Sequence, residues 1–187
     1  DRARAFGRVT SEIGRMEALI HDLLLLAELG ESGYREREDL DLSEFLASYC
    51  EDFTALHPQR NVSMTIEPGI HITIARDHLA RFIQNSLNNI SRHTPEAAPV
   101  AISLSLNGKR ATLIIEDGGE GLPESAYGEK IQSLTRFDPS RSREGGGSGL
   151  GMSIMAGVIS KAGGELALRK SSLGGLAIVA QLPAYRQ

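Results

Sequence analysis

The sequence predicts an α+β fold, a two-layer α/β sandwich preceded by one long amino-terminal helix. Two observations predict this fold. Apolar residues recur at alternating steps of three and four through the first 27 residues, which is a helical period. Beyond residue 39, helical patterns alternate with short stretches of strand-like polarity. Three further helices among mostly antiparallel strands are typical of helices layered on a sheet.

The composition indicates a globular chain of one or two domains. It has 187 residues, 41% of them apolar, and a net charge of −4, which excludes a disordered chain and gives no basic surface for nucleic acid. We expect no membrane contact, because no uninterrupted apolar stretch is long enough to span a bilayer. The single cysteine, Cys50, cannot form an internal disulfide, which favours a reducing compartment. The chain begins at Asp1 without a signal peptide, and we interpret it as part of a longer protein.

The first helix carries an apolar seam in heptad spacing. Such a seam predicts packing against a missing neighbouring helix, a second copy of the chain, or both. The alternative is an ordinary helix packed on its own domain. Gly30 and Gly33 end the helix, so we expect a helical segment at 1–30, a linker at 31–38 and a second domain at 39–187. We interpret His21 as a solvent-facing histidine of this helix. The seam consists of Phe6, Val9, Ile13, Met16, Ile20, Leu23 and Ala27.

The second domain should contain three helices and several mostly antiparallel strands. Asp41 or Ser43 can cap the first of these helices and Asp77 the second. Asn107-Gly108 predicts a hairpin, and residues 117–149 are expected to form a long mobile loop. The expected helices are 44–53, 77–93 and 149–161, and the expected strands are 62–66, 71–74, 100–106, 111–116, 165–169 and 177–182.

The helix expected at 77–93 has a polar face of unusual chemistry. Asn85, Asn89 and Arg92 lie together, opposite the apolar residues of the same helix. Asparagine is a mediocre helix former. Its amide oxygen suits a magnesium ion that is also held by phosphates, and arginine can bind phosphate oxygens. The alternative is a solvated polar face.

Two glycine clusters follow this helix. In the first, Asp117 ends an apolar strand and precedes the glycines at 118, 119 and 121. A carboxylate there can accept a hydrogen bond from an exocyclic amine while bare backbone lets a flat base approach; the alternative is a tight turn. In the second, residues 145–151 lead into a helix whose amino-terminal amides favour phosphate. No lysine follows these glycines, so this is not a GxxxxGK[ST] loop, and the alternative is a flexible linker.

In their order and spacing, these segments resemble the sequence boxes of sensor histidine kinases. Residues 85–95 resemble the asparagine box and residues 117–123 the first glycine box. Arg136-Phe137 resembles the phenylalanine box, and residues 145–151 resemble the second glycine box. Residues 15–24 are similar to the second helix of the dimerisation and phosphotransfer domain, so the resemblance covers nearly the whole chain.

The resemblance implies a Bergerat-type ATP-binding domain, as in gyrase, Hsp90 and MutL, with helices on one face of a mixed sheet. It implies ATP and magnesium as ligands and Asn89 and Arg92 as the residues that act in catalysis. The implied roles are as follows: Asn89 ligates magnesium with support from Asn85, Arg92 contacts phosphate, His93 lies beside the nucleotide, Asp117 binds the adenine amino group, Gly119 and Gly121 line the base, and Gly147, Gly149, Leu150 and Gly151 approach the phosphates beneath a lid that holds Phe137.

The implied function is transfer of the ATP γ-phosphoryl group to a histidine, for relay to a response-regulator aspartate. The family's phosphoacceptor motif occurs nowhere in the chain, so we expect that histidine upstream of residue 1, in a homodimer. The chain would be the cytoplasmic portion of a membrane-anchored bacterial sensor. The alternative is a regulatory ATP-binding module or degenerate kinase that acts through a protein partner. Departures from the usual boxes at Ile90, Gly118, Glu120 and Leu176 are compatible with that alternative.

Overall fold

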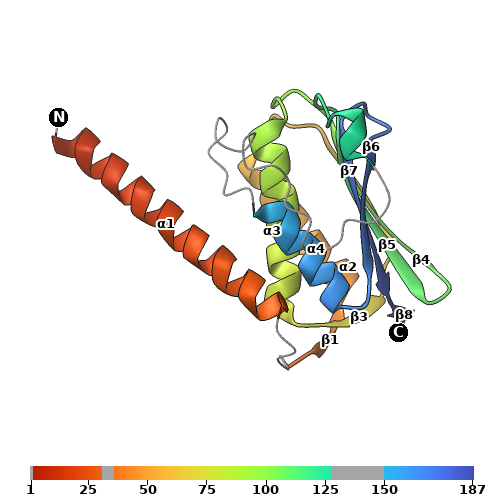
Figure 1. The fold of residues 1–187 in the computed structure, drawn as a ribbon. Helices are drawn as coiled ribbons and strands as arrows, with labels where there is room; N and C mark the ends of the chain where they lie inside the picture. Colours follow the sequence, from red (N-terminus) through yellow and green to blue (C-terminus); the bar gives the residue numbers. More distant parts are fainter. Residues whose placement is uncertain (1, 31–35, 128–149) are drawn as a thin grey trace.

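The computed structural model describes residues 2–30, 36–127 and 150–187. All helices and strands expected from the sequence are present within these ranges, and the strands β1 and β8 and the 3₁₀ helix η1 were not predicted (Figure 1). The elements are α1 (Arg2–Gly30), β1 (Glu38–Asp41), α2 (Leu42–Leu56), β2 (Val62–Ile66), β3 (Ile70–Ile74), α3 (Arg76–His93), β4 (Val100–Asn107), β5 (Arg110–Asp117), η1 (Glu124–Ala126), α4 (Gly151–Lys161), β6 (Glu165–Lys170), β7 (Leu176–Pro183) and β8 (Tyr185–Arg186).

The strands form two hydrogen-bonded sheets. The larger has the order β2-β4-β5-β7-β6 and is mixed, because β2 pairs parallel with β4 whereas the other pairs are antiparallel. The hairpin between β4 and β5 turns at Gly108, whose φ of 60° suits glycine, so the predicted Asn107-Gly108 hairpin is confirmed. The smaller sheet has the order β1-β3-β8. Its two outer strands are only four and two residues long, too short to show a strand pattern in the sequence.

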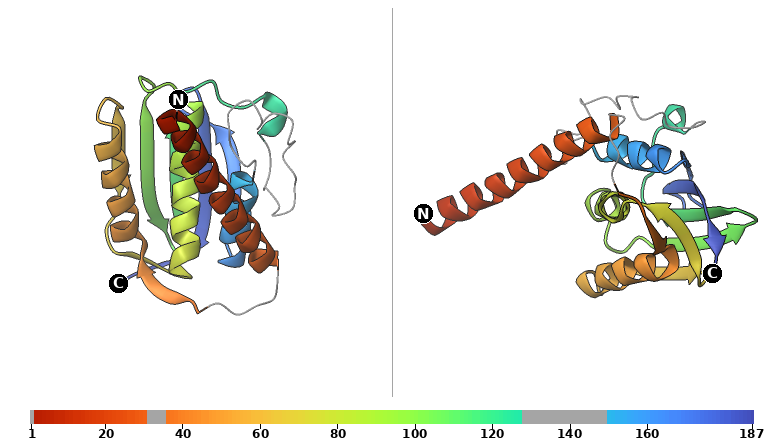
Figure 2. Two further views of the ribbon diagram at one scale, coloured as in Figure 1. Left: turned by 90° about the vertical axis from the view of Figure 1, so that its left-hand side faces the viewer. Right: turned by 90° about the horizontal axis from the view of Figure 1, so that it is seen from below.

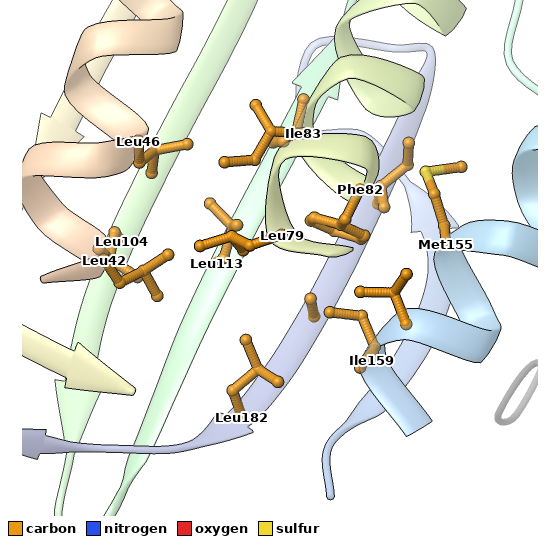
Figure 3. Close-up of a cluster of buried hydrophobic side chains, with 14 of the residues drawn as sticks. Leu42, Leu46, Leu79, Phe82, Ile83, Leu104, Leu113, Met155, Ile159 and Leu182 are labelled. Carbon is orange, nitrogen blue, oxygen red and sulfur yellow. The ribbon is translucent and has the colours of Figure 1, made fainter. Parts of the chain in front are cut away.

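Helices α2, α3 and α4 cover the same side of the strands (Figure 2). Their apolar faces meet the strands in one hydrophobic core, part of which Figure 3 shows. Cys50 lies in this core, and burial raises the pKa of its thiol to about 12, which keeps it protonated at neutral pH. Core residues labelled in the figure are Leu42 and Leu46 of α2, Leu79, Phe82 and Ile83 of α3, Met155 and Ile159 of α4, and Leu104, Leu113 and Leu182 of the strands.

The helix starts agree with one predicted cap and contradict the other. Asp41 caps α2, and its side chain accepts a hydrogen bond from the Glu44 amide at 3.0 Å. Asp77 does not cap α3, because the cap residue is Ala75 and makes no side-chain cap bond. Strand β3 ends at Ile74, so the chain enters the helix two residues earlier than expected. The charge of Asp77 instead lies in the first turn, where it suits the helix dipole.

Helix α1 projects away from the body of the molecule (Figures 1 and 2). Its predicted seam is exposed: every large residue from Phe6 to Leu23 in that seam is more than half accessible, as is Leu24. The alternative expectation, that this seam packs on the chain's own domain, is therefore wrong. The expectation for His21 is confirmed, because its side chain is exposed. No helix among the described residues is long and apolar enough to cross a membrane.

The carboxy-terminal part of α1 does pack on the second domain, through a different face from the seam. Leu29 lies against Gly157 of α4, where an added Cβ would approach Leu29 Cδ1 to 3.0 Å. Lys161 donates a hydrogen bond to the Glu28 carbonyl oxygen at 2.8 Å. Asp22 forms an ion pair with Arg81 of α3, with Arg81 Nε 3.1 Å from Asp22 Oδ1. The helix is thus attached at its base to both α3 and α4.

Candidate functional site

The polar residues expected at the site lie on a flank of α3, between its core face and the exposed residues Gln84 and Asn88. Asn85 and Asn89 are half-buried, whereas Arg92 and His93 are exposed at the end of the helix. Asn85 donates from Nδ2 to the Arg81 carbonyl oxygen at 2.9 Å, which holds the amide in place. Its other amide atom, Oδ1, would be 3.2 Å from a Cβ added to Gly151. The asparagine face and the start of α4 are therefore neighbours.

Asp117 ends β5 as a buried carboxylate, only 6% exposed. Its Oδ1 accepts a hydrogen bond from the Gly119 amide at 2.8 Å. Within the described part of the chain, no group donates to Oδ2. One carboxylate oxygen is thus fixed by the backbone, and the second is left to accept from a ligand. An accessible acceptor atom on a largely buried residue suits a ligand that brings its own N–H donor.

The end of α3 and the first glycine cluster touch each other. A Cβ added to Gly119 would lie 2.9 Å from Thr94 Cγ2 and equally close to Asp117 Oδ1. Since real Cβ atoms do not approach other atoms so closely, a side chain at Gly119 would displace one of these two neighbours. Thr94 itself is buried and ends α3 directly after His93. The end of α3 and the residues that follow β5 are therefore in contact through Thr94 and Gly119.

Tyr127 supports the remainder of the first glycine cluster. Its hydroxyl oxygen accepts a hydrogen bond from the Leu122 amide at 2.6 Å. Gly121 has a φ of 71°, and a Cβ there would lie 2.5 Å from the same hydroxyl. Both the backbone conformation and the space therefore require glycine at position 121. Tyr127 follows the glycines by several residues, and no pattern in the sequence connects the two.

The second glycine box is described only at its end. Leu150 is half-buried and is the cap residue of α4, which begins at Gly151. The carbonyl oxygen of Leu150 accepts from the Ile154 amide at 2.9 Å. A helix start bears partial positive charge and free amides, which suit a phosphate. Phe137, Gly147 and Gly149 lie outside the described residues, as does most of the segment expected to be mobile.

Arg60 is a supporting residue that the sequence did not indicate. Its guanidinium is buried and donates to the carbonyl oxygens of Thr94 and Pro95, each at 3.2 Å. A cation suits this position, because the carboxy-terminal end of a helix bears partial negative charge. Arg60 comes just before β2, 34 residues ahead of Thr94. Only the tertiary structure shows that it holds the end of α3 against the glycine cluster.

Comparison with known proteins identifies the family of this domain. A profile described as histidine kinase-, DNA gyrase B-, and HSP90-like ATPase matches residues 74–186. The match covers more than half of the chain, and the chain belongs to this family. The resemblance to sensor histidine kinases is confirmed, because the curated relatives include such proteins.

Three relatives illustrate the similarity. Sensor protein RstB of Escherichia coli K12 is 35% identical over 170 residues, which covers 88% of this chain and 38% of that protein. The probable sensor histidine kinase TcrY of Mycobacterium tuberculosis is 31% identical, covering 90% and 36%. The solved mycobacterial sensor histidine kinase MprB has a TM-score of 0.68 and 26% identity, covering 81% of this chain and 99% of that one. The chain thus spans little more than a third of the length of the first two proteins.

The role of Arg60 can be tested by substitution. Arg60→Ala removes two charge-assisted hydrogen bonds and leaves the buried Thr94 carbonyl oxygen without this donor, so the free energy of unfolding should fall by about 3 kcal/mol. Arg60→Lys keeps the charge but not the planar fork, and it should have an intermediate effect. Chemical denaturation gives both values. Arg110→Ala, at an exposed position of β5, is the control. If Arg60→Ala is as stable as the control, the supporting role is wrong.

Proposed function

We propose that this chain is the catalytic part of a sensor histidine kinase. It binds ATP with magnesium and transfers the γ-phosphoryl group to a histidine upstream of residue 1, for relay to a response-regulator aspartate. The observation that carries the proposal is the buried Asp117 carboxylate, with Oδ1 held by Gly119 and Oδ2 left for a ligand. It lies beside glycine backbone and near the amide-rich face of α3. The match to the ATPase family supports ATP as the ligand.

The proposed roles follow the chemistry of each group. Asp117 Oδ2 accepts from the adenine amino group, and the backbone at Gly119 and Gly121 faces the base. Asn89 contributes its amide oxygen to magnesium, whose other ligands are phosphate oxygens and water. Phosphoryl transfer depends mainly on positioning and electrostatics, so no side chain here needs to act as a base. Asn85 supports the magnesium site, and His93 and Phe137 lie around the nucleotide. The residues proposed to contact phosphates are Arg92, Gly147, Gly149, Leu150 and Gly151.

We further propose that residues 1–30 form the second helix of a dimerisation and phosphotransfer domain, that 31–38 are a linker, and that 39–187 are the catalytic domain. The exposed seam of α1 supports this division, because such a stripe of apolar residues needs a partner helix. In the longer protein the partner would be the helix that carries the phosphoacceptor histidine, within a dimer. The assembly would belong to the cytoplasmic portion of a membrane-anchored bacterial sensor.

The alternative, a degenerate or purely regulatory ATP-binding module, rests on the departures from the usual boxes. Packing supplies a reason for two of them. A Cβ at Gly118 would lie 2.7 Å from Pro99 Cδ and 3.2 Å from the Leu173 carbonyl oxygen, so this fold requires glycine at position 118. Leu176 is 4% exposed and belongs to the hydrophobic core. These two departures are therefore explained by packing and not by loss of function, which favours the kinase.

Nucleotide binding tests the site. Asp117→Ala should weaken ATP affinity about tenfold or more, because it removes a buried acceptor from the base. Asn89→Ala should reduce the gain in affinity that magnesium provides. Calorimetry with and without magnesium measures both effects. Asn88→Ala, on the same helix but exposed, is the matched control. Unchanged affinity in both site variants would refute the assignment.

Phosphotransfer tests the reaction. With γ-labelled ATP, the chain alone should gain no acid-labile, base-stable phosphate, because its one α1 histidine, His21, lacks the family's acceptor sequence. A longer chain that includes the upstream histidine should become labelled. His21→Ala in that longer chain should leave the label unchanged. A phosphate mapped to His21, or a longer chain that binds ATP without being labelled, would contradict the proposal.

Assembly tests the seam. Burial of each large apolar side chain is worth about 1.5 to 3 kcal/mol, so the seam should pair with a second copy. Sedimentation should show a concentration-dependent homodimer. The double variant Ile13→Glu with Ile20→Glu should abolish it, whereas Ala18→Glu, at an exposed position of α1 outside the seam, should not. A chain that stays monomeric at all concentrations would show that α1 does not self-associate.

A further inference from the structure

The turn between β6 and β7 packs against the Asp117 carboxylate. It comprises residues 171–175, and its last residue, Gly175, is buried. A Cβ added to Gly175 would lie 2.6 Å from both the Asp117 carbonyl oxygen and the Gly119 amide nitrogen, and closer still to Asp117 Oδ1. A Cβ on Gly121 would lie 3.2 Å from the Gly175 carbonyl oxygen. The backbone of Gly175 therefore touches all three residues that we assign to the base.

The strand ladder does not hold this turn. The last register pair of β5 with β7 is Glu116 with Ala177, and the last pair of β6 with β7 is Lys170 with Leu176. Beyond these pairs, the Gly175 amide donates to the Asp117 carbonyl oxygen at 3.0 Å, and the Ser171 amide donates to the Gly175 carbonyl oxygen at 2.9 Å. At the tip, the Ser172 and Leu173 amides donate to side chains instead of backbone carbonyls, so side chains must hold these two residues.

Glu116 makes those contacts. Its Oε2 accepts hydrogen bonds from Ser171 Oγ at 2.9 Å, from the Ser172 amide at 2.9 Å and from Ser172 Oγ at 3.2 Å. Hydrogen bonds to an ionised carboxylate are about twice as strong as neutral ones. The turn is also braced internally, since Ser171 Oγ accepts from the Leu173 amide at 2.9 Å. Glu116 thus ties the turn as a unit to the end of β5.

Glu116 and Asp117 are consecutive residues with different tasks. Asp117 has one oxygen on Gly119 and the other available to the ligand, whereas the Glu116 carboxylate engages the turn. If the turn moved, Gly175 would no longer confine Asp117 Oδ1, and the carboxylate could rotate away from the Gly119 amide. The orientation of Oδ2, which receives the base, would then be lost.

We propose that Glu116 is a positioning residue that determines base selectivity. By holding residues 171–175 against Asp117, it keeps Oδ2 in position to accept a hydrogen bond from the exocyclic amine of adenine. The same orientation disfavours a 6-oxopurine, which has a carbonyl oxygen in place of that amine. The inference rests on the proposed function, specifically on Asp117 as the acceptor for the base. It adds a residue that touches neither base nor phosphate.

Binding of ATP and of inosine triphosphate tests the proposal, because the two differ in the group at the 6-position of the base. In Glu116→Ala, the ratio of the two affinities should fall about tenfold, the worth of one buried hydrogen bond to a charged group. Affinity for magnesium tripolyphosphate should stay unchanged, since no phosphate contact is altered. Glu116→Gln keeps one acceptor and should recover part of the ratio. Ser171→Ala weakens the same attachment from the other side and should shift the ratio in the same direction.

A second readout needs no nucleotide. In chain labelled with ¹⁵N-glycine, Glu116→Ala should shift the amide resonances of Gly119 and Gly175, because both donate to Asp117. Thr112→Ala is the matched control, on the same face of β5 but four residues earlier. It should change neither the resonances nor the affinity ratio.

The outcomes separate the inference from the proposed function. A folded Glu116→Ala chain with an unchanged affinity ratio and unchanged Gly119 and Gly175 resonances would overturn the inference, while Asp117→Ala still weakened ATP binding. A wild-type chain that binds ATP and inosine triphosphate equally would overturn the inference together with the assignment of Asp117 as the acceptor for the base. Equal losses for ATP, inosine triphosphate and tripolyphosphate would show a general structural role and would also overturn the inference.

Discussion

Helix α3 imposes the constraint on which the rest of the structure depends. Its apolar residues, among them Leu79 and Phe82, are fully buried against the strands. At 100° per residue, that burial places Asn85 and Asn89 on a flank of the helix, between the core face and the exposed Asn88, and both are half-buried. The start of α4 and the glycine cluster after β5 then meet this polar face. A hydrophobic requirement thus sets the geometry of a polar site.

In the proposed site, glycine backbone lies on the side that would face the ligand, and charged side chains support the site from the other side. Glycine backbone lines the approach to Asp117, so the surface there has few side chains to move. The bracing comes from residues that do not face the ligand: Arg60 holds the end of α3, and Glu116 holds the β6–β7 turn. Both use a charged group with several hydrogen bonds, which is stronger than neutral pairing. In the function that we propose, this arrangement orients the Asp117 carboxylate for the base.

Helix α1 has two apolar surfaces, and only one of them packs on the second domain. One packs at its base on α4, where Leu29 meets Gly157, and the ion pair of Asp22 with Arg81 joins it to α3. The other, the heptad seam, remains exposed. Arg81 also accepts the hydrogen bond of Asn85 through its carbonyl oxygen, so the base of α1 adjoins the helix that carries the asparagines. The projecting helix and the site therefore share one structural support.

By itself, the sequence determined the three helices of the domain, most of its strands, the hairpin at Gly108, and the candidates Asn85, Asn89 and Asp117. Those features follow from local periodicity and turn chemistry, which nearby residues encode. Only the tertiary structure decided that the strands divide into two sheets and that Ala75, not Asp77, is the cap residue of α3. It alone placed Arg60, Tyr127 and the turn held by Glu116 around the site. Contacts such as that of Glu116 with Ser171 join residues 55 positions apart, and no local pattern records which distant partner a side chain meets.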